Sequence, residues 1–207
     1  MLILERDELL LVECKNIKTA YMIHLGFLEY KIFEWGLHMK KIIVIGCPGS
    51  GKSTFSRNLS KCLDIPVIHL DLLNWNSDRT VVEREVFLNR QSEALKGDAW
   101  IIDGNYGSTI EMRIAACDTI FFLDLPFEVC LESIEQRKGK ERPDMPWIET
   151  GETDPEFIAF IKQYNIVSRP KVIELLEKYP DKKQIIFRSR EAVNGYINDY
   201  LSFSGND

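Results

Sequence analysis

The stretch Gly46-Cys47-Pro48-Gly49-Ser50-Gly51-Lys52-Ser53 matches the phosphate-loop pattern G-x-x-x-x-G-K-[ST] at every fixed position. The run before it, Lys41-Ile42-Ile43-Val44-Ile45, is apolar and β-branched, which predicts a buried strand. After it, apolar residues recur at the spacing of one helix face, at Phe55, Leu59, Cys62 and Leu63. Because the pattern is specific when a strand precedes it and a helix follows it, we predict a nucleotide phosphate site here.

Each part of this stretch has a physical task. The glycines allow the backbone to curl so that successive N–H groups point at phosphate oxygens. The helix that begins near Ser53 adds unpaired N–H groups and the positive end of its dipole. The pattern assigns Lys52 to the β- and γ-phosphates and the Ser53 hydroxyl to Mg²⁺. The expected nucleotide contacts are Gly46, Cys47, Pro48, Gly49, Ser50, Gly51, Lys52, Ser53 and Thr54.

The composition limits the class of protein. The chain has 207 residues, of which 45% are hydrophobic and 28% charged, which suits one domain with a sizeable core, with or without an appendage. The net charge of −6 argues against direct DNA binding and against a membrane surface, and no apolar run approaches the roughly 18–20 residues of a membrane helix. The five cysteines include no C-x-x-C pair, which predicts reduced thiols and a cytoplasmic protein. Both a monomer and a homodimer stay open.

Residues 1–38 differ from the rest of the chain. Acidic side chains interrupt their apolar residues, and they lack the basic start, continuous apolar stretch and cleavage site of a secretory signal. Met39 lies directly before the first expected strand, so we expect residues 39–207 to form the phosphate-loop domain. Two interpretations of residues 1–38 stay open. They are an upstream extension that is not translated, with Met39 as the start, or a helical arm that packs on the domain or on a partner.

Short apolar runs alternate with helical patterns from Met39 onward. This alternation predicts an α/β fold, with a parallel sheet covered by helices on both faces. We expect loops over residues 71–80 and 139–153, and we expect Pro170 to break or kink a helix because proline lacks a backbone N–H. The expected strands lie at residues 41–45, 66–70, 100–102, 119–123 and 184–187.

Acidic residues follow three of these strands. Asp71, Asp103 and Asp124 stand at carboxyl ends of expected strands, where parallel sheets bind their ligands. Either Asp103 or Asp124 could organise Mg²⁺, and we favour Asp103 because Gly104 would allow a substrate to approach closely. We expect Asp71 to accept a proton from an acceptor hydroxyl or to hold Mg²⁺. The alternative for each is a turn or capping carboxylate.

Basic residues cluster after the fourth expected strand, at Arg137, Lys138, Lys140 and Arg142. We interpret them as part of a lid, residues 139–153, that folds over the transferring phosphoryl group, with Arg137 and Arg142 as catalytic cations. The alternative is a solvated helix end whose cations complement the helix dipole.

Several motifs together resemble one family. Residues 39 to about 201 are similar to small bacterial proteins called DNA topology modulation proteins, which belong with the adenylate-kinase-like phosphate-loop kinases. The resemblance implies a five-stranded sheet of order 2-3-1-4-5, a short lid after the fourth strand, and ATP with Mg²⁺. Adenylate kinase shows Asp-Gly-Phe-Pro-Arg where this chain has Asp-Gly-Asn-Tyr, and the missing arginine argues against AMP as the acceptor. The matching motifs are Ile45–Ser53, His69-Leu70-Asp71, Trp75, Asp103-Gly104-Asn105-Tyr106, Arg113 and Asp118–Asp124.

Two functions from different classes follow from these patterns. The first is a phosphotransferase that uses Mg·ATP and acts on a nucleotide or another small-molecule acceptor. The second is a regulatory or DNA-associated ATPase without a small acceptor. The basic lid, the carboxylate after the second strand and the acidic composition favour the kinase. The sequence contains no Asn-Lys-x-Asp guanine motif, which argues against a GTPase.

Overall fold

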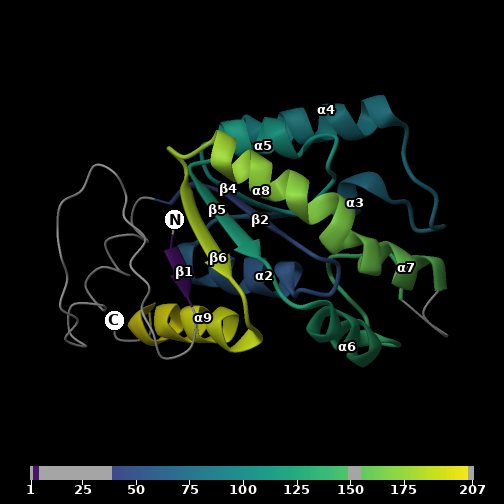
Figure 1. Ribbon diagram of the computed structural model, residues 1–207. Coiled ribbons are helices and arrows are strands. Elements are labelled where there is room, and N and C mark those ends of the chain that lie inside the picture. Colours follow the sequence, from purple (N-terminus) through teal and green to yellow (C-terminus); the bar gives the residue numbers. More distant parts are fainter. Residues whose placement is uncertain (1, 5–38, 149–154, 205–207) are drawn as a thin grey trace.

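The computed structural model describes residues 2–4, 39–148 and 155–204, with side chains over 39–148 and 155–198. A central parallel sheet lies between two layers of helices (Figure 1). Its strands lie in the order β1-β6-β5-β2-β4-β3. The strands are β1 Leu2–Leu4, β2 Lys41–Gly46, β3 Val67–His69, β4 Trp100–Asp103, β5 Thr119–Leu123 and β6 Lys183–Phe187.

The predicted sheet order is confirmed. Counted along the chain from β2, the five strands lie in the order 2-3-1-4-5, and every pairing among them is parallel. The phosphate loop therefore leaves the central strand, β2, at the carboxyl edge of the sheet. His69 and Asp103, which end β3 and β4, and Asp124, which follows β5, belong to the same edge.

A sixth strand adds to the predicted five. β1 pairs in parallel with β6, with Leu2 opposite Ile185 and Leu4 opposite Phe187. An edge strand has unpaired N–H and C=O groups on its outer side. β1, a short apolar strand, pairs with these groups along β6. The boundary between an N-terminal extension at residues 1–38 and a domain at residues 39–207 remains a prediction. The alternative, that residues 1–38 form a helical arm, concerns mainly residues 5–38, which lie outside the described residues.

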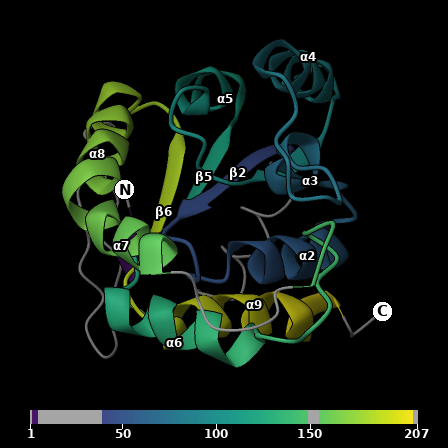
Figure 2. The ribbon, with the colours of Figure 1, turned by 90° about the vertical axis from the view of Figure 1, so that its right-hand side faces the viewer.

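The helices form one layer on each face of the sheet. Figure 1 and Figure 2 show α2 and α9 on one face, and α4, α5 and α8 on the other. Within the described residues, no helix has both the length and the apolar character needed to span a membrane. The helices are α2 Lys52–Leu63, α3 Leu70–Asn74, α4 Arg84–Leu95, α5 Ile110–Ala116, α6 Phe127–Arg137, α7 Pro155–Gln163, the π-helical turn η1 Tyr164–Ser168, α8 Arg169–Lys178 and α9 Arg190–Ser204.

Alternation along the buried strands creates two cores. In β2, Ile42 and Val44 belong to the core beneath α2 and α9, whereas Ile43 and Ile45 belong to the core beneath α4, α5 and α8. A parallel strand covered on both faces is apolar along its whole length, which is why residues 41–45 read as a continuous apolar run.

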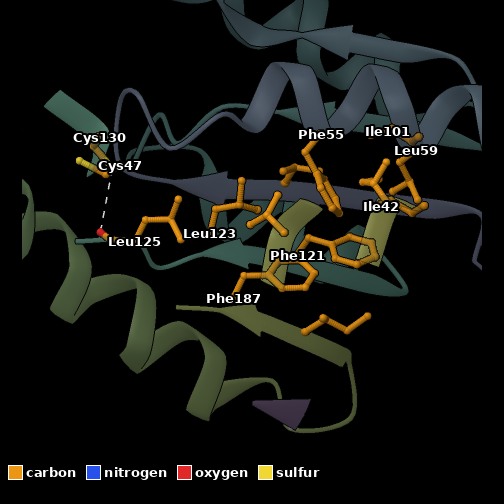
Figure 3. Close-up of a cluster of buried hydrophobic side chains, with 14 of the residues drawn as sticks. Ile42, Cys47, Phe55, Leu59, Ile101, Phe121, Leu123, Leu125, Cys130 and Phe187 are labelled. Carbon is orange, nitrogen blue, oxygen red and sulfur yellow. Dashed lines mark hydrogen bonds between the residues drawn. The ribbon is translucent and has the colours of Figure 1, made fainter. Parts of the chain in front are cut away.

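An aromatic cluster fixes the helix that follows the phosphate loop. Phe55 of α2 lies with its ring centroid 4.9 Å from that of Phe121 and 5.6 Å from that of Phe187 (Figure 3). Tyr196 of α9 contacts the same rings. Aromatic side chains bury large apolar areas, so this cluster anchors the start of α2 against β5 and β6.

One local expectation needs correction. The expected loop at 71–80 begins with a short helix, α3, which starts at the fully buried Leu70. Asp71 therefore lies on the first turn of a helix and not at the end of a strand.

The regular helix is interrupted at Pro170, as expected. The π-helical turn η1 lies directly before α8, and Pro170 stands in the first turn of α8. Proline has no backbone N–H to donate, which explains an interruption at this position.

Candidate active site

The phosphate loop has a backbone that only glycine adopts easily. Gly49 and Gly51 have φ angles of +84° and +90°, in the left-handed region. A side chain at Gly49 would also meet the carbonyl oxygen of Cys130 in α6. The glycines of the pattern therefore serve both the curl of the loop and its close packing against α6.

Lys52 lies inside the curl of the loop. Its Nζ donates hydrogen bonds to the carbonyl oxygens of Gly46 and Cys47, each at 3.1 Å. Burial lowers the pKa of Lys52, whereas the negative charges of Asp103 and Asp71 oppose that shift. A cation held between the loop and these two carboxylates is suited to bind an anionic group that enters the site.

Two side chains from distant parts of the chain brace the loop, and the sequence analysis missed both. Asn105 accepts a hydrogen bond from the Gly46 N–H at 3.0 Å, and its Nδ2 donates to the Gly46 carbonyl at 2.6 Å. On the outer side, Arg190 at the start of α9 donates to the carbonyl oxygens of Ser50 at 2.6 Å and Gly49 at 3.2 Å. A loop held from both sides is pre-organised for its ligand.

Asp103 ends β4 and is buried. Its Oδ1 is hydrogen-bonded to Nδ1 of His69 at 2.8 Å, whereas its Oδ2 has no protein partner. Asp124, the competing candidate, differs because both of its carboxylate oxygens accept hydrogen bonds from Arg169, at 2.6 and 2.7 Å. The geometry therefore leaves Asp103, and not Asp124, with an oxygen available to a ligand.

Gly104 has a structural reason that the sequence did not show. A side chain there would lie 3.0 Å from Cβ of Leu70, and the residue has a φ of +124°. Packing against α3 and the backbone conformation both favour glycine here, and the approach of a substrate stays a prediction. Arg113, with none of its surface exposed, donates to the Gly104 carbonyl at 2.7 Å and to the carbonyl oxygen of Asn105, so it fixes the turn that carries Asn105.

Asp71 faces the phosphate loop from α3. Its Oδ1 accepts a hydrogen bond from the hydroxyl of Tyr106 at 2.7 Å. Burial raises the pKa of Asp71, and the Tyr106 hydrogen bond and the charge of Lys52 counteract the rise. A carboxylate of raised proton affinity, within the field of the loop lysine, can accept a proton from a bound hydroxyl.

The predicted lid has its first part in the described residues, 139–148, whereas residues 149–154 lie outside them. Lys138, which lies between α6 and this segment, pairs with Glu135 of α6 at 2.5 Å, and Arg142 within the segment pairs with Asp144. Arg137 ends α6. Trp147 contacts Trp75 edge to face, with ring centroids 5.4 Å apart. The indole contact joins this segment to the residues that follow α3.

Two thiols lie together behind the phosphate loop. Cys47 of the loop and Cys130 of α6 are both buried and hydrogen-bonded to each other, and Figure 3 shows them beside one another at one end of the core cluster. The hydrogen bond and burial raise the pKa of Cys47 far above its usual value. Cys47 therefore packs as a neutral side chain rather than contributing charge to the phosphate site.

A hollow of about 260 Å³ lies between the start of α2 and α9. Arg190 and Gly51 border it on the side of the phosphate loop, and Thr54 opens onto it from α2. Its polar lining comes mainly from the amides of Asn58, Asn194 and Asn198.

Solved structures of similar fold are shikimate kinases. The shikimate kinase from Acinetobacter baumannii in complex with shikimate aligns with a TM-score of 0.51 at 15% identity, covering 82% of this chain and 95% of that one. The shikimate kinase from Bacteroides thetaiotaomicron aligns with a TM-score of 0.49 at 19% identity, covering 80% of this chain and 98% of that one. No protein-family model matches the sequence, and no curated protein is similar to it.

The chain shares its α/β fold with the Acinetobacter baumannii structure, and its phosphate loop follows the central strand. The carboxyl edge of the sheet has groups suited to a nucleotide and its metal ion. Oδ2 of Asp103 is buried without a hydrogen-bond partner, and the charge of Asp103 acts on Lys52. In the part of the chain that the structure describes, no group of three His, Cys, Asp or Glu side chains could hold a metal by itself.

Proposed function

We propose that the protein is a Mg·ATP-dependent phosphotransferase that acts on a small-molecule acceptor bearing a hydroxyl group. The observation that carries this proposal is the position of Lys52 between the braced phosphate loop and the carboxylates of Asp71 and Asp103. An ATPase without an acceptor needs no carboxylate on α3. The resemblance to the topology modulation proteins stays a prediction alongside this proposal.

The proposed reaction uses the residues of the site in separate roles. The loop amides and Lys52 bind the phosphates of ATP. Ser53 and Asp103 would hold Mg²⁺, which neutralises charge on the phosphate oxygens when bound. Arg137 and Arg142 are the proposed cations that face the transferring group.

Asp71 is the proposed proton acceptor. The acceptor oxygen forms a bond to the γ-phosphorus while the bond from that phosphorus to the oxygen of ADP breaks, and the hydroxyl proton passes to the Asp71 carboxylate. Tyr106 donates a hydrogen bond to Asp71, so it holds the carboxylate in place before the acceptor binds.

The test is a screen for acceptors with ATP labelled in the γ-phosphate, using the full chain. Shikimate, other hydroxylated metabolites and nucleotides are offered one at a time, and duplex DNA is included as a separate addition. We expect label to appear in a small molecule with the native protein and to be lost in Lys52→Ala with the fold retained. Lys61→Ala, at the exposed end of the same helix, is the matched control.

The alternative makes the opposite prediction. If DNA stimulates release of labelled phosphate and no small molecule accepts it, the protein is a DNA-associated ATPase. If Lys52→Ala keeps full ATP turnover, the phosphate loop is not the nucleotide site and the proposal is wrong.

A further inference from the structure

A buried carboxylate in the predicted lid contacts the start of α2. Asp144 is 2% exposed, and its Oδ1 accepts a hydrogen bond from Nη1 of Arg57 at 3.0 Å. Its Oδ2 accepts a hydrogen bond from Nη2 of Arg142. Neither Asp144 nor Arg57 belongs to a recognisable motif in the sequence.

These contacts join two parts of the site. Ser53 and Arg57 lie one turn apart on α2, directly after the phosphate loop, whereas Arg142 and Asp144 belong to the segment that follows α6. Asp144 thus seats that segment on the helix whose N-terminus faces the phosphates.

Two guanidinium groups bond to this carboxylate, which favours its ionised form over the neutral acid. Loss of one partner of a buried ion pair leaves the other partner uncompensated, so this cluster favours one arrangement of Arg142 strongly.

The contacts of Asp144 place Arg142 near the start of α2. Asp144 bonds both Arg142 and Arg57 of α2, so it holds the guanidinium of Arg142 beside the helix that follows the phosphate loop. The charge of Arg142 also lowers the pKa of Asp71 on α3. The last phosphate of a nucleotide in the phosphate loop would occupy this region.

We propose that Asp144 is a positioning residue that holds Arg142 against the terminal phosphate of bound ATP by docking the segment at residues 139–148 on the start of α2. This role rests on the proposed function, because it requires ATP in the phosphate loop. Asp144 acts through Arg142 and does not itself contact the transferring group. Trp147, which contacts Trp75, supports the same docking farther along the segment.

The test compares binding of a non-hydrolysable ATP analogue and of ADP, both with Mg²⁺, by calorimetry. Asp144→Asn keeps the shape of the side chain but removes the charge that orients Arg142. We expect the ATP analogue to bind about tenfold more weakly and ADP to bind within about threefold of the native protein, because charge-assisted hydrogen bonds to the last phosphate are lost. Glu111→Gln is the matched control, since its carboxylate pairs with Lys178 at 2.5 Å between α5 and α8.

A double variant shows whether Asp144 acts through Arg142. In an Arg142→Gln background, Asp144→Asn should weaken binding of the ATP analogue no further. Hydrogen exchange over residues 139–148 should be faster in Asp144→Asn than in Glu111→Gln without any nucleotide.

Three results would overturn the role of Asp144. They are equal losses for the ATP analogue and ADP, unchanged binding of both, or additive effects in the double variant. If the native protein binds neither nucleotide, the proposed function itself fails, and the role of Asp144 fails with it.

Discussion

The two sides of the site are held in different ways. On the side of the phosphate loop, Asn105 and Arg190 form hydrogen bonds with backbone carbonyl and N–H groups of the loop. The shape of the loop therefore depends on contacts with its uncharged backbone. On the facing side, side chains bind each other, as in the bond between Asp71 and Tyr106 and the pairing of Asp144 with Arg142.

This difference has a consequence for function. Backbone contacts depend on the path of the chain and change little when a ligand enters. The contacts of the Asp71 and Asp144 carboxylates depend on charge, so a phosphate or an acceptor that enters the site competes with them directly. We expect substitutions on the two sides to separate nucleotide binding from phosphoryl transfer.

The largest expected effect is on the facing side. Asp71→Asn should reduce transfer to the true acceptor by about 10²–10⁴-fold, the usual contribution of a proton acceptor, while ATP affinity changes little. Rates and affinities are measured with the acceptor found by the screen. Transfer that survives within about tenfold would make Asp71 a structural residue and Asp103 the next candidate.

The same carboxylate predicts a pH dependence. Because burial raises the pKa of Asp71 above its usual 3.8, the proton acceptor is lost at a higher pH than for an exposed aspartate. Transfer should fall as the pH drops through that raised pKa, with a slope that is absent in Asp71→Asn. A profile that is unchanged by the substitution would contradict the assignment.

A smaller effect is expected on the phosphate-loop side. Asn105→Ala removes both hydrogen bonds to Gly46 and should weaken binding of the ATP analogue about tenfold, with a loss of about 1–3 kcal/mol in the free energy of unfolding. Asn76→Ala, whose exposed amide bonds only Thr80, should change stability by less than about 0.5 kcal/mol. Equal effects of the two variants would show that Asn105 does not brace the loop.

The segment at residues 139–148 should respond to nucleotide. Its cations have a reason to approach bound phosphates, so hydrogen exchange there should slow when the ATP analogue is added. Trp147→Ala should reduce this slowing, because it removes the edge-to-face contact with Trp75, which contributes on the order of 0.5–1.5 kcal/mol. No change on adding nucleotide would favour a solvated surface over a lid.

The smallest effect should come from residues 1–38. The fragment 39–207 should fold and bind the ATP analogue with the affinity of the full chain, because the five strands of the phosphate-loop fold and the contacts of the loop lie within it. Among the described residues of the removed segment, the contact that is lost is the pairing of β1 with β6. Circular dichroism and calorimetry compare the two proteins, and an insoluble fragment beside a stable full chain would show that residues 1–38 belong to the domain.

The sequence predicted the fold because its signals are local. The phosphate-loop pattern fixes a strand, a loop and a helix within about twenty residues, and alternation of apolar runs with helical patterns specifies a parallel sheet. It failed at α3, where five residues carry too weak a periodicity to distinguish a helical turn from a loop. It also gave no sign that Gly104 packs against Leu70, because this contact joins residues that are far apart in the chain.

By itself, the sequence thus determined the alternation of strands and helices, the place of Lys52 and Ser53, and the carboxylates at one edge of the sheet, whereas the order of the strands came from the family resemblance. The tertiary structure decided which carboxylate keeps a free oxygen, Asp103 rather than Asp124, because Arg169 lies 45 positions from its partner and carries no local signal. It likewise decided that Asn105, Arg190 and Asp144 belong to the site. A polar side chain in a loop can bind many partners, and only the packing of the layers brings one of them within hydrogen-bonding distance.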